Sequence, residues 1–419
     1  MSRRVLLVSD AYAPTIGGAE RSVGSIAAEL VRRGHAVAVA TAWHPGLPAR
    51  ETRDGVEVNR VRDLTSRVPW VSDNPYKHVP PPWPDPEAVV RLRRLVRRFR
   101  PDVVHSYGWL TYSCAAALAR TRIPLVLSMR DYGNFCAVRT LLHRRREPCS
   151  GPAPGKCLGC AAQHYGAAKG AAAVAGVLGG RRPLARRVAG AHFNSEFMRD
   201  VTWRHLLAGR ARFERDSRAE AAVPPFADDR ESGPGDGAAL AQLPGEPYIL
   251  FVGALRLIKG LTDLVDAYVR IEDAPPLVLA GTREIDTPPA FPPGVTVVES
   301  MPHGAVMRAW DRALFGVFPS RAPEPFGVVV HEAMTRGRAV IGTTPGGHAE
   351  MIEDGRSGLL VRSGDVEGLA AAMRRLIGDR ELRERLGAGA RERAAAFSAE
   401  RLVPRLEELL EAAVAGAAR

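Results

Sequence analysis

The stretch VLLVSDAYAPTIGGAERSVGSIAAELVRRGHAVAVA, residues 5–40, decides the fold class. Its apolar run at residues 5–9 predicts a buried parallel strand, and the Pro and Gly residues within 14–18 predict a loop. Between residues 19 and 33 apolar side chains recur at helical spacing, and Gly34 stands where a helix would end. Residues 36–40 predict the next strand. The stretch is therefore a βαβ unit whose loop follows the carboxyl end of its first strand.

The same alternation continues along the chain. Further strands are predicted at residues 56–61, 102–106, 124–128 and 192–195 and, after a break, at 248–252, 276–280, 295–298, 314–318 and 339–343. The helices between them are predicted at residues 86–100, 113–120, 260–271 and 328–336. This order predicts an α/β fold with two Rossmann-like domains, whose parallel sheets face each other across a cleft.

The break in the pattern sets the expected domain boundaries. Residues 208–246 are dominated by Arg, Glu, Asp, Gly and Pro, which predicts a linker. We therefore expect a first domain at 1–207 and a second domain at 247–395. Residues 396–419 predict a C-terminal amphipathic helix, and one arrangement open to it is packing back on the first domain.

The composition is that of an ordinary globular protein. The 419 residues are 46% hydrophobic and 25% charged, which suffices for packed cores and argues against disorder. No apolar run reaches the roughly 18–20 residues of a membrane span. The basic N-terminus leads into an apolar run too short for a signal peptide. We expect a cytoplasmic protein.

The charge is unevenly distributed. Residues 1–205 carry 32 Lys and Arg against 15 Asp and Glu, whereas residues 206–419 carry 26 against 31. Arg clusters at residues 91–98, 144–146 and 181–187 all lie in the basic half. They fit a solvated helix face, or peripheral contact with the inner face of an anionic membrane. Nucleic acid is an unlikely partner because no aromatic residues alternate with the arginines.

Two Gly-Gly loops follow predicted strands. Gly17 and Gly18 precede the first helix, and Gly346 and Gly347 occupy the equivalent place in the second domain. Glycine lets the backbone approach a ligand closely, and a helix N-terminus attracts phosphate or sugar oxygens. A tight turn without a ligand is the alternative. The first loop is not G-x-G-x-x-G, which disfavours a dinucleotide site.

Charged residues follow two strands of the second domain. Arg256 and Lys259 follow the strand at 248–252, where two cations beside a helix start suit a diphosphate. Glu324 follows the strand at 314–318, and Glu332 lies eight residues later inside a helix. More than two helical turns separate the carboxylates, so they suit separate hydroxyl pairs on one elongated ligand. Solvated surface side chains are the alternative.

The chain resembles the retaining GT-B glycosyltransferases of family 4 (group 1 type). The resemblance runs over nearly the whole chain and is weakest at 140–245. It rests on four segments in this order: Gly17-Gly18 with Glu20, Lys259-Gly260, EPFGVVVHE from Glu324 to Glu332, and Gly346-Gly347 with Glu350. It implies an enzyme that moves a hexose from a nucleotide-diphosphate sugar to an unidentified glycan, lipid-linked or small-molecule acceptor. The first domain would be the acceptor side, and the second would bind the donor.

The resemblance also implies roles for single residues in the donor site. Glu332 would hold the donor ribose, and Glu324 would contact the donor sugar. Phe326 and Gly327 would offer backbone groups to that sugar. Gly18 would approach the phosphates from the first domain.

Arg256 and Lys259 would neutralise the departing diphosphate. The family usually has Arg where this chain has Ala254, and Arg256 would take its place. The chain contains no D-x-D, so we expect no metal-bridged diphosphate and no cofactor required for catalysis. The leaving phosphate oxygen would take the acceptor's proton on the same face of the sugar, which gives retention. Where the family often has His-Asp, this chain has Arg130 and Asp131, which we assign to the acceptor side.

Four of the five cysteines cluster in the loop at 136–160. They are Cys136, Cys149, Cys157 and Cys160, and the last two form a CxxC. A cytosolic chain disfavours disulfides. Four clustered thiols suit a structural Zn²⁺ site, while unligated thiols and, less favoured, an iron–sulfur cluster are the alternatives.

Two other function classes remain open from sequence. One is a non-catalytic basic α/β protein that binds nucleic acid or an anionic membrane. The other is a GT-B nucleotide-sugar epimerase. Loss of donor turnover on Glu332→Ala separates an enzyme from a polyanion binder, and release of free sugar isomers without acceptor product favours the epimerase.

Overall fold

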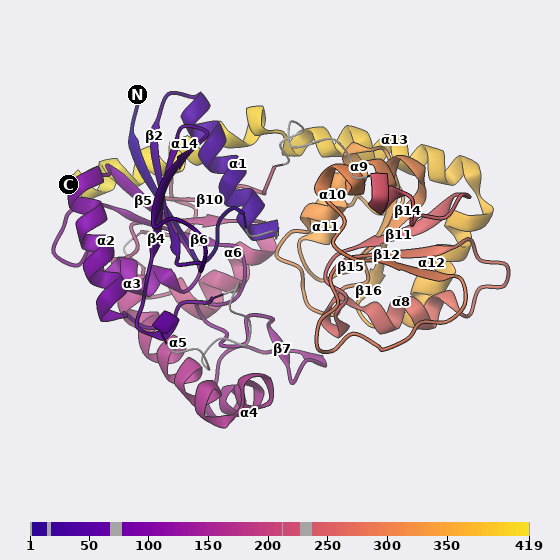
Figure 1. The fold of residues 1–419 in the computed structure, drawn as a ribbon, viewed down its shortest axis with the longest axis horizontal. Helices are drawn as coiled ribbons and strands as arrows, with labels where there is room; N and C mark the ends of the chain where they lie inside the picture. The colour runs from indigo at the N-terminus through magenta and orange to yellow at the C-terminus, as the bar shows by residue number, and fades with distance from the viewer. Residues whose placement is uncertain (1, 15–17, 68–77, 212, 227–236, 419) are drawn as a thin grey trace. The chain divides into compact units, whose positions relative to one another are not determined.

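The protein consists of two compact units. The computed structural model describes residues 2–14, 18–67, 78–211, 213–226 and 237–418. Unit 1 comprises residues 1–224 and 399–419, and unit 2 comprises residues 225–398. Each unit is an α/β body with its own sheet (Figure 1). The predicted α/β class with two parallel sheets is confirmed.

Unit 1 contains an eight-stranded sheet in the order β10-β9-β6-β5-β1-β2-β4-β3. Neighbouring strands are parallel except for the antiparallel edge pair β3–β4. The strands are β1 (Arg4–Ser9), β2 (Ala36–Ala42), β3 (Arg50–Arg53), β4 (Val56–Val61), β5 (Val103–Tyr107), β6 (Leu125–Met129), β9 (Gly190–Phe193) and β10 (Glu220–Ala222). The order places the carboxyl ends of β1, β2 and β4 next to one another.

Helices flank this sheet (Figure 1). They are α1 (Gly18–Arg32), α2 (Pro86–Phe99), α3 (Leu110–Ala117), α5 (Ala167–Arg187), α6 (Glu196–Thr202) and α14 (Ala399–Ala418), with short turns η1 (Thr65–Arg67) and η3 (Trp203–Leu207). Helix α2 forms because its apolar residues share one face, where Leu92, Val96 and Phe99 are buried, while Pro86 opens the first turn.

The segment between β6 and α5 is an insertion with its own small elements. A two-stranded antiparallel hairpin, β7 (Leu142–His143) and β8 (Glu147–Pro148), precedes helix α4 (Pro154–Tyr165). Helix α4 packs along α5. The hairpin turn contains Arg144 and Arg145 with positive φ. This region coincides with the predicted Cys-rich loop.

The C-terminal helix α14 packs on unit 1, against β9 and β10. Ion pairs fix its polar side: Arg3 contacts Glu411 at 2.6 Å, and Arg33 contacts Glu407 at 3.0 Å. His35 Nε2 also lies 2.9 Å from Glu407. These contacts join the end of the chain to its first βαβ unit.

Unit 2 contains a six-stranded parallel sheet in the order β13-β12-β11-β14-β15-β16. The strands are β11 (Tyr248–Val252), β12 (Leu277–Ala280), β13 (Val295–Val298), β14 (Ala313–Val317), β15 (Ala339–Thr344) and β16 (Leu359–Arg362). The helices are α7 (Gly237–Leu240), α8 (Leu261–Tyr268), α9 (His303–Arg312), α10 (Val328–Thr335), α11 (His348–Met351), α12 (Val366–Gly378) and α13 (Arg380–Ala394), with turns η5 (Leu257–Lys259) and η6 (Ala395–Phe397). The loops after β11, β14 and β15 therefore meet at one edge.

The segment 208–246, expected as a linker, contains regular elements at both ends. Strand β10 extends the sheet of unit 1, and α7 packs on α9 in unit 2. Glu220 anchors β10 to unit 1, because its buried carboxylate accepts hydrogen bonds from the Arg199 guanidinium and the Trp203 indole N–H. A high charge content therefore does not mark the whole segment as linker.

Asp85 is a buried cap whose removal should cost stability. Its Oδ1 atom accepts the Ala88 N–H at 3.0 Å, and Oδ2 accepts the Leu64 N–H at 3.1 Å. We expect Asp85→Ala to lower the free energy of unfolding by about 1–2 kcal/mol. Asp85→Asn keeps one acceptor oxygen and should lose less. Urea unfolding of the full chain measures both, and equal stability of wild type and Asp85→Ala would contradict the capping role.

Candidate active site

Lys259 and Glu324 form an ion pair in unit 2. Lys259 ends the turn after β11, and Glu324 lies in the loop after the neighbouring strand β14. The Lys259 ammonium donates to Glu324 Oε1 at 2.7 Å, and 37% of the lysine side chain remains exposed. An ammonium has three N–H donors, so this bond leaves two for an anionic ligand.

Gly260 allows these two loops to meet. Its φ is +73°, and a Cβ atom there would lie 1.8 Å from Pro319 O. Only glycine fits such a close approach of two backbones. The N–H groups of Arg321 and Ala322 donate to Ile258 O at 3.0 and 3.2 Å. The lysine loop is thereby fixed against the glutamate loop.

The Glu324 carboxylate is stabilised in its ionised form. Burial raises its pKa, but the charge of Lys259 and hydrogen bonds from Lys259 and Ser320 outweigh burial, and the pKa is lowered. The Ser320 hydroxyl donates to the same Oε1 atom. A buried carboxylate needs such compensation, and here the compensating cation is itself accessible.

The Gly346-Gly347 loop supports the loop that carries Glu324. The Gly347 N–H donates to Glu324 O at 2.7 Å. A Cβ atom at Gly346 would lie 2.8 Å from Glu324 N, and one at Gly347 would lie 2.5 Å from Phe326 Cα. The absence of side chains at these positions is therefore required by packing. The donor contact predicted for both glycines rests on the sequence.

The sequence analysis missed His348, which is buried beside Glu324. Its Nδ1 atom lies 3.3 Å from Thr343 N, so Nδ1 accepts and Nε2 carries the proton. A Cβ atom at Gly327, where φ is +115°, would lie 2.7 Å from His348 Nε2. Burial lowers the pKa of His348 to about 4, although Glu324 opposes this shift. The imidazole is neutral at neutral pH. A histidine directly after a Gly-Gly loop was the available signal.

Phe326 turns its ring away from the charged pair. The side chain is 2% exposed and contacts the Phe397 ring edge-on, with ring centres 5.4 Å apart. The backbone contacts to the donor sugar that are predicted for Phe326 and Gly327 stay a prediction from the sequence.

Glu332 lies inside α10 and is 1% exposed. Its Oε1 atom is 3.9 Å from His303 Nδ1, at the start of α9. His303 was not identified from the sequence. Glu332, which is predicted to hold the donor ribose, thus lies beside an imidazole from a different helix. The His303 side chain is 20% exposed.

Arg256 has a carboxylate partner of its own. Its Nε atom lies 3.7 Å from Asp286 Oδ1, and the side chain is 25% exposed. The Lys259 N–H donates to Arg256 O, so the two residues share one turn. Arg256 and Lys259, predicted to act together, are close along the backbone. Their side chains contact different carboxylates, those of Asp286 and Glu324.

Of the first Gly-Gly loop, Gly17 lies outside the described residues. Gly18 begins α1 and is exposed. It follows β1, the central strand of unit 1, as predicted.

Arg130 and Asp131 follow β6 in unit 1, and both are held by neighbours. Arg130 is 5% exposed, and its guanidinium donates to Ser128 Oγ at 3.2 Å and to the Ser22 hydroxyl of α1. Asp131 accepts from the Tyr107 hydroxyl at 2.9 Å and from Arg139. Asp131, Tyr107 and Arg139 thus form a polar network, and Arg130 is held separately by two serine hydroxyls.

Arg139 links this network to Asp10 at the end of β1. Its guanidinium contacts Asp131 Oδ2 at 2.5 Å and Asp10 Oδ2 at 3.2 Å. Burial raises the pKa of Asp10, while Arg139 and the N–H groups of Leu110 and Trp109 oppose the shift. The sequence analysis missed Asp10 and Arg139. Arg139 lies in the insertion between β6 and α5 and belongs to no motif.

Two family models match the chain. The model described as "Glycosyl transferases group 1" matches residues 238–393, and the model described as "Glycosyltransferase Family 4" matches residues 16–157. This chain belongs to the GT-B glycosyltransferases of family 4, group 1 type. The family predicted from the four sequence segments is confirmed.

Several curated proteins are similar to this chain in sequence. The D-inositol 3-phosphate glycosyltransferase of Nocardia farcinica is 32% identical over 197 residues, covering 42% of this chain and 44% of that protein. The glycogen synthase of Mycobacterium tuberculosis is 27% identical over 418 residues, covering 93% and 90%. The match thus spans less than half of the first relative and most of the second.

Solved structures share the GT-B fold of this glycosyltransferase. Sucrose-phosphate synthase from Thermosynechococcus elongatus has a TM-score of 0.73 at 19% identity, with 98% of both chains covered. Anabaena HepE, solved in complex with UDP-glucose, has a TM-score of 0.66 at 16% identity, with 97% of this chain and 98% of HepE covered.

The zinc prediction is not supported. Among the described residues, which include all four clustered cysteines, no group of three or more His, Cys, Asp or Glu is arranged to hold a metal ion. The Cys149 thiol donates to Gly151 O at 3.6 Å, and Cys160 Sγ accepts the Arg144 N–H at 3.1 Å. Burial raises the pKa of Cys136 and Cys157, which favours the neutral thiols. These cysteines pack against the core of unit 1.

The buried His348 should make stability depend on pH. An unfolded histidine titrates near 6.5, so between pH 6.5 and about 4 the unfolded chain binds a proton that the folded chain does not. Stability therefore falls as the pH is lowered through this range. We expect His348→Gln to reduce that loss by up to about 3 kcal/mol. Urea unfolding at several pH values measures the slope, and the comparison at pH 8 isolates any cost independent of protonation. An unchanged slope would contradict the assignment.

Proposed function

We propose that this enzyme transfers a hexosyl group from a nucleotide-diphosphate sugar to an acceptor hydroxyl, with retention of the anomeric configuration. The observation that carries the proposal is the ion pair of Lys259 and Glu324 at adjacent strand ends of unit 2. It combines an accessible cation with an ionised carboxylate, the two groups that a diphosphate and a sugar diol respectively require. The UDP-glucose bound to the similar fold of HepE supports the donor class.

Lys259 neutralises the departing diphosphate in this proposal. Glu324 accepts a hydrogen bond from one N–H of the ammonium, and the other two N–H groups remain for the diphosphate. Arg256, one turn earlier, adds a second cation and has Asp286 as its carboxylate partner. Stabilising the charge that develops on the leaving phosphate is an effective use of fixed cations.

The rest of the donor site follows from the same loops. Glu324 also contacts hydroxyls of the donor sugar, with backbone groups of Phe326 and Gly327. Glu332 holds the donor ribose, with His303 3.9 Å away. Gly346 and Gly347 position the sugar-binding loop and lie at the diphosphate.

The reaction exchanges two bonds. The bond from the anomeric carbon to the β-phosphate oxygen breaks, and the bond from that carbon to the acceptor oxygen forms on the same face. The acceptor's proton passes to the leaving phosphate oxygen, so no protein base is needed. Charge neutralisation by Lys259 and Arg256 requires no metal ion, and EDTA should leave the rate unchanged.

Removing the ion pair should abolish turnover while leaving the fold intact. We expect Lys259→Met and Glu324→Gln to lower kcat by about 10²–10³-fold, the range for loss of one preorganised transition-state contact. Donor turnover is measured with UDP-, GDP-, ADP- and TDP-glucose, and proton NMR reads the anomeric configuration of the product. Lys156→Met, at a lysine of α4 that donates to Ser150, is the matched control.

Three outcomes contradict the proposal. If no nucleotide sugar is bound or turned over, the donor class is wrong. If Lys259→Met retains full kcat, the ion pair is not catalytic. If the wild type releases free sugar isomers and no glycoside, the epimerase alternative is favoured.

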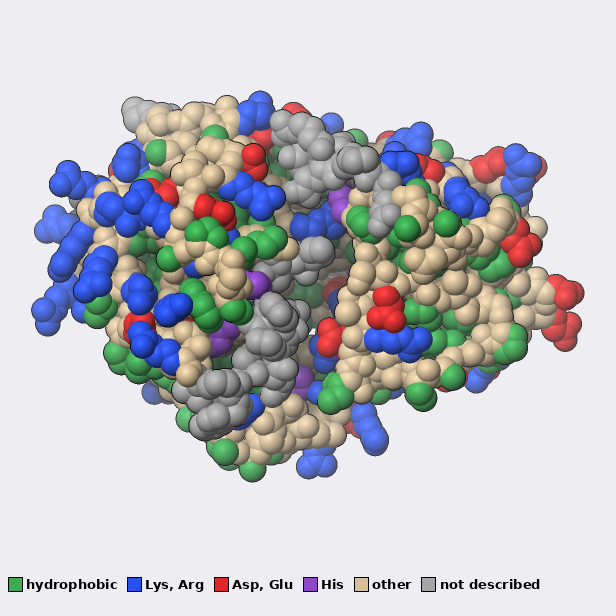
Figure 2. Space-filling model, viewed as in Figure 1, with side chains coloured by type: hydrophobic (Ala, Val, Ile, Leu, Met, Phe, Trp, Pro, Cys, Tyr) green, Lys and Arg blue, Asp and Glu red, His purple; other side chains and the backbone are tan. Residues whose placement is uncertain are grey.

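We also propose that unit 1 contacts an anionic membrane. Helix α2 carries five arginines and one glutamate, α5 carries four arginines and one lysine without an acid, and Arg120 and Arg122 follow α3. Arg93 donates to Ala116 O and Arg187 to Ile123 O, so α2 and α5 both lie beside α3 and the segment that follows it. Figure 2 shows blue side chains gathered along the edge of the molecule occupied by α2.

The exposed face of α2 suits a lipid surface. Val90 is 44% exposed and lies one turn before the exposed Arg93 and Arg94, with Arg97 one turn further on. Apolar and basic side chains together favour an interface with anionic lipids over bulk water. In the described part of the chain, no helix has the length and apolarity needed to cross a bilayer.

Neutralising three arginines of α2 should weaken vesicle binding. Each basic residue near an anionic surface contributes about 1 kcal/mol, so the triple variant R93Q/R94Q/R97Q should bind about 10²-fold more weakly. Sedimentation with vesicles of phosphatidylglycerol and phosphatidylcholine measures this. The matched control R374Q/R375Q/R385Q removes three exposed arginines from unit 2. Equal binding of both variants, or equal binding to neutral vesicles, would refute the contact.

A further inference from the structure

A second ion pair joins the same two segments of unit 2 as the pair of Lys259 and Glu324. The Arg321 guanidinium donates from Nε to Asp263 Oδ2 at 2.7 Å and from Nη2 to Asp263 Oδ1 at 2.5 Å. Asp263 lies in the first turn of α8, and Arg321 lies in the loop after β14 that also carries Glu324. Two N–H···O bonds to the two oxygens of one carboxylate hold both side chains in a fixed relative orientation.

The position of this pair is well determined because Asp263 is buried. The Asp263 side chain is 3% exposed, whereas that of Arg321 is 36% exposed. A buried carboxylate that loses its cation destabilises the fold, so the guanidinium has a strong preference for this place. The hydrogen bond to Asp263 raises the pKa of Arg321, and the guanidinium stays charged. The Arg321–Asp263 pair therefore ties the loop after β14 to α8.

Arg321 contacts the chain on both sides of Lys259. Its backbone N–H donates to Ile258 O at 3.0 Å, one residue before the lysine. Its guanidinium holds Asp263, four residues after the lysine. The short segment that carries Lys259 is thus fixed at both ends by one residue of the loop that carries Glu324.

Arg321 also follows the serine that contacts Glu324. The Ser320 hydroxyl donates to Glu324 Oε1, and Ser320 O accepts the Thr343 hydroxyl at 3.0 Å. Arg321 O accepts the Ser363 hydroxyl at 3.0 Å. These hydrogen bonds tie residues 320 and 321 to β15 and to the segment after β16, and the guanidinium adds the tie to α8.

We propose that Arg321 and Asp263 are positioning residues for the proposed glycosyl transfer. Their pair holds the Lys259 ammonium and the Glu324 carboxylate in the relative position that the departing diphosphate and the donor sugar require, and neither residue touches the substrate. Small displacements of reacting or charge-stabilising groups cost large factors in rate, and supporting hydrogen bonds prevent them. The positioning role rests on the proposed function, whereas the effect of the pair on Glu324 can be measured without any donor.

Removing the guanidinium should lower kcat more than it changes the donor KM. We expect Arg321→Met to lower kcat by about 10²-fold, because the displaced groups act on the transition state. Arg321→Lys keeps a charge for Asp263 but replaces the two-pronged guanidinium with a point charge, so it should restore part of kcat. Initial rates with UDP-, GDP-, ADP- and TDP-glucose measure both parameters.

Asp263→Asn tests whether the two residues act as one unit. Arg321→Met leaves a buried carboxylate unpaired, which should lower the free energy of unfolding. The double variant Arg321→Met/Asp263→Asn removes that carboxylate, so it remains measurable even where the single variant fails to fold. Because both substitutions remove the same contact, the double variant should lose no more of kcat than Arg321→Met does.

The ionisation of Glu324 reports the same contact without any donor. Lys259 of η5 and His348 of α11 act on its charge, and the Ser320 hydroxyl donates to it. If Arg321→Met loosens the loop, the contacts from Lys259 and Ser320 weaken and the pKa of Glu324 should rise. NMR titration of the full chain, with glutamate labelled at its carboxyl carbon, measures this pKa. Glu324→Gln identifies the signal.

Arg199→Met in unit 1 is the matched control. Arg199 also pairs with a buried carboxylate, that of Glu220, to which its Nε and Nη2 atoms donate at 3.0 and 2.6 Å. The Glu220 side chain is 1% exposed. This variant should lower the free energy of unfolding as Arg321→Met does, yet leave kcat and the pKa of Glu324 unchanged.

The proposal is overturned if Arg321→Met keeps the wild-type kcat, or if the pKa of Glu324 is the same in this variant and the wild type. Equal losses of kcat in Arg321→Met and Arg199→Met would also overturn it, because the effect would then be one of stability. If the wild type turns over no nucleotide sugar while Arg321→Met still raises the pKa of Glu324, the donor assignment is wrong and the positioning of Glu324 stands. Wild-type turnover that Arg321→Met leaves unchanged refutes only the positioning role.

Discussion

The contact between Lys259 and Glu324 joins the loops that follow β11 and β14 in unit 2. A carboxylate placed in a mostly buried loop must be compensated, and a catalyst for diphosphate release needs that compensating cation to remain reachable. One lysine satisfies both demands because only one of its N–H groups is used by Glu324. The geometry depends on Gly260, whose backbone passes so close to Pro319 that any side chain would collide. The geometry of the ion pair thus depends on backbone packing as much as on charge.

Strand order explains why these residues meet. Strands β11, β14 and β15 are neighbours in space although they are separated in sequence, so their loops converge at one edge of the sheet. Gly346 and Gly347 then stack on the glutamate loop, and His348 fills the space behind it as a neutral side chain. A charged histidine there would compete with Lys259 for Glu324. Burial is what keeps the imidazole neutral and leaves the pairing to lysine.

The sequence predicted the elements whose pattern is local and missed those that depend on distant partners. Strand β4 and the helix α2 follow from apolar periodicity and lie within one residue of the predicted bounds. The sequence placed Lys259 and Glu324 after strands of one parallel sheet but did not predict that they form an ion pair. Arg139 was missed because its partners Asp10 and Asp131 come from other strand ends. The cysteine spacing permitted a metal site, but spacing does not decide whether thiols converge or pack against a core.

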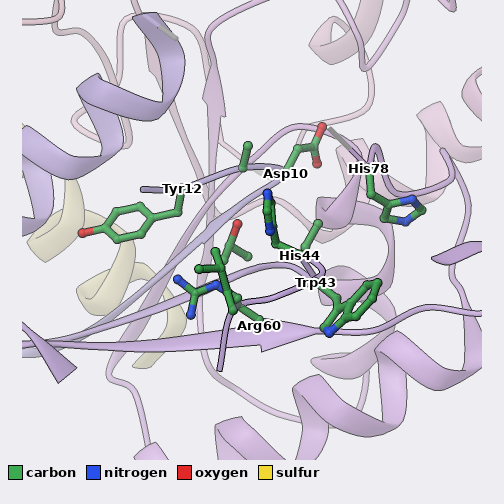
Figure 3. Close-up of a pocket in the computed structure, with 10 residues that line it drawn as sticks. Asp10, Tyr12, Trp43, His44, Arg60 and His78 are labelled. Carbon is green, nitrogen blue, oxygen red and sulfur yellow. The ribbon is translucent and has the colours of Figure 1, made fainter. Parts of the chain in front are cut away.

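The charged side chains at the strand ends differ between the two units in whether protein partners leave them accessible. In unit 2 the Lys259 ammonium stays partly exposed and can accept an anion without losing its carboxylate. In unit 1 the corresponding edge, shown in Figure 3, has Asp10 and Arg60 engaged with protein partners. The excess of arginine in unit 1 lies instead on the outer helices α2 and α5. A protein that bound polyanions in both units would be expected to leave cations free at both edges. The observed difference between the two units agrees with the proposed diphosphate donor at the strand ends of unit 2.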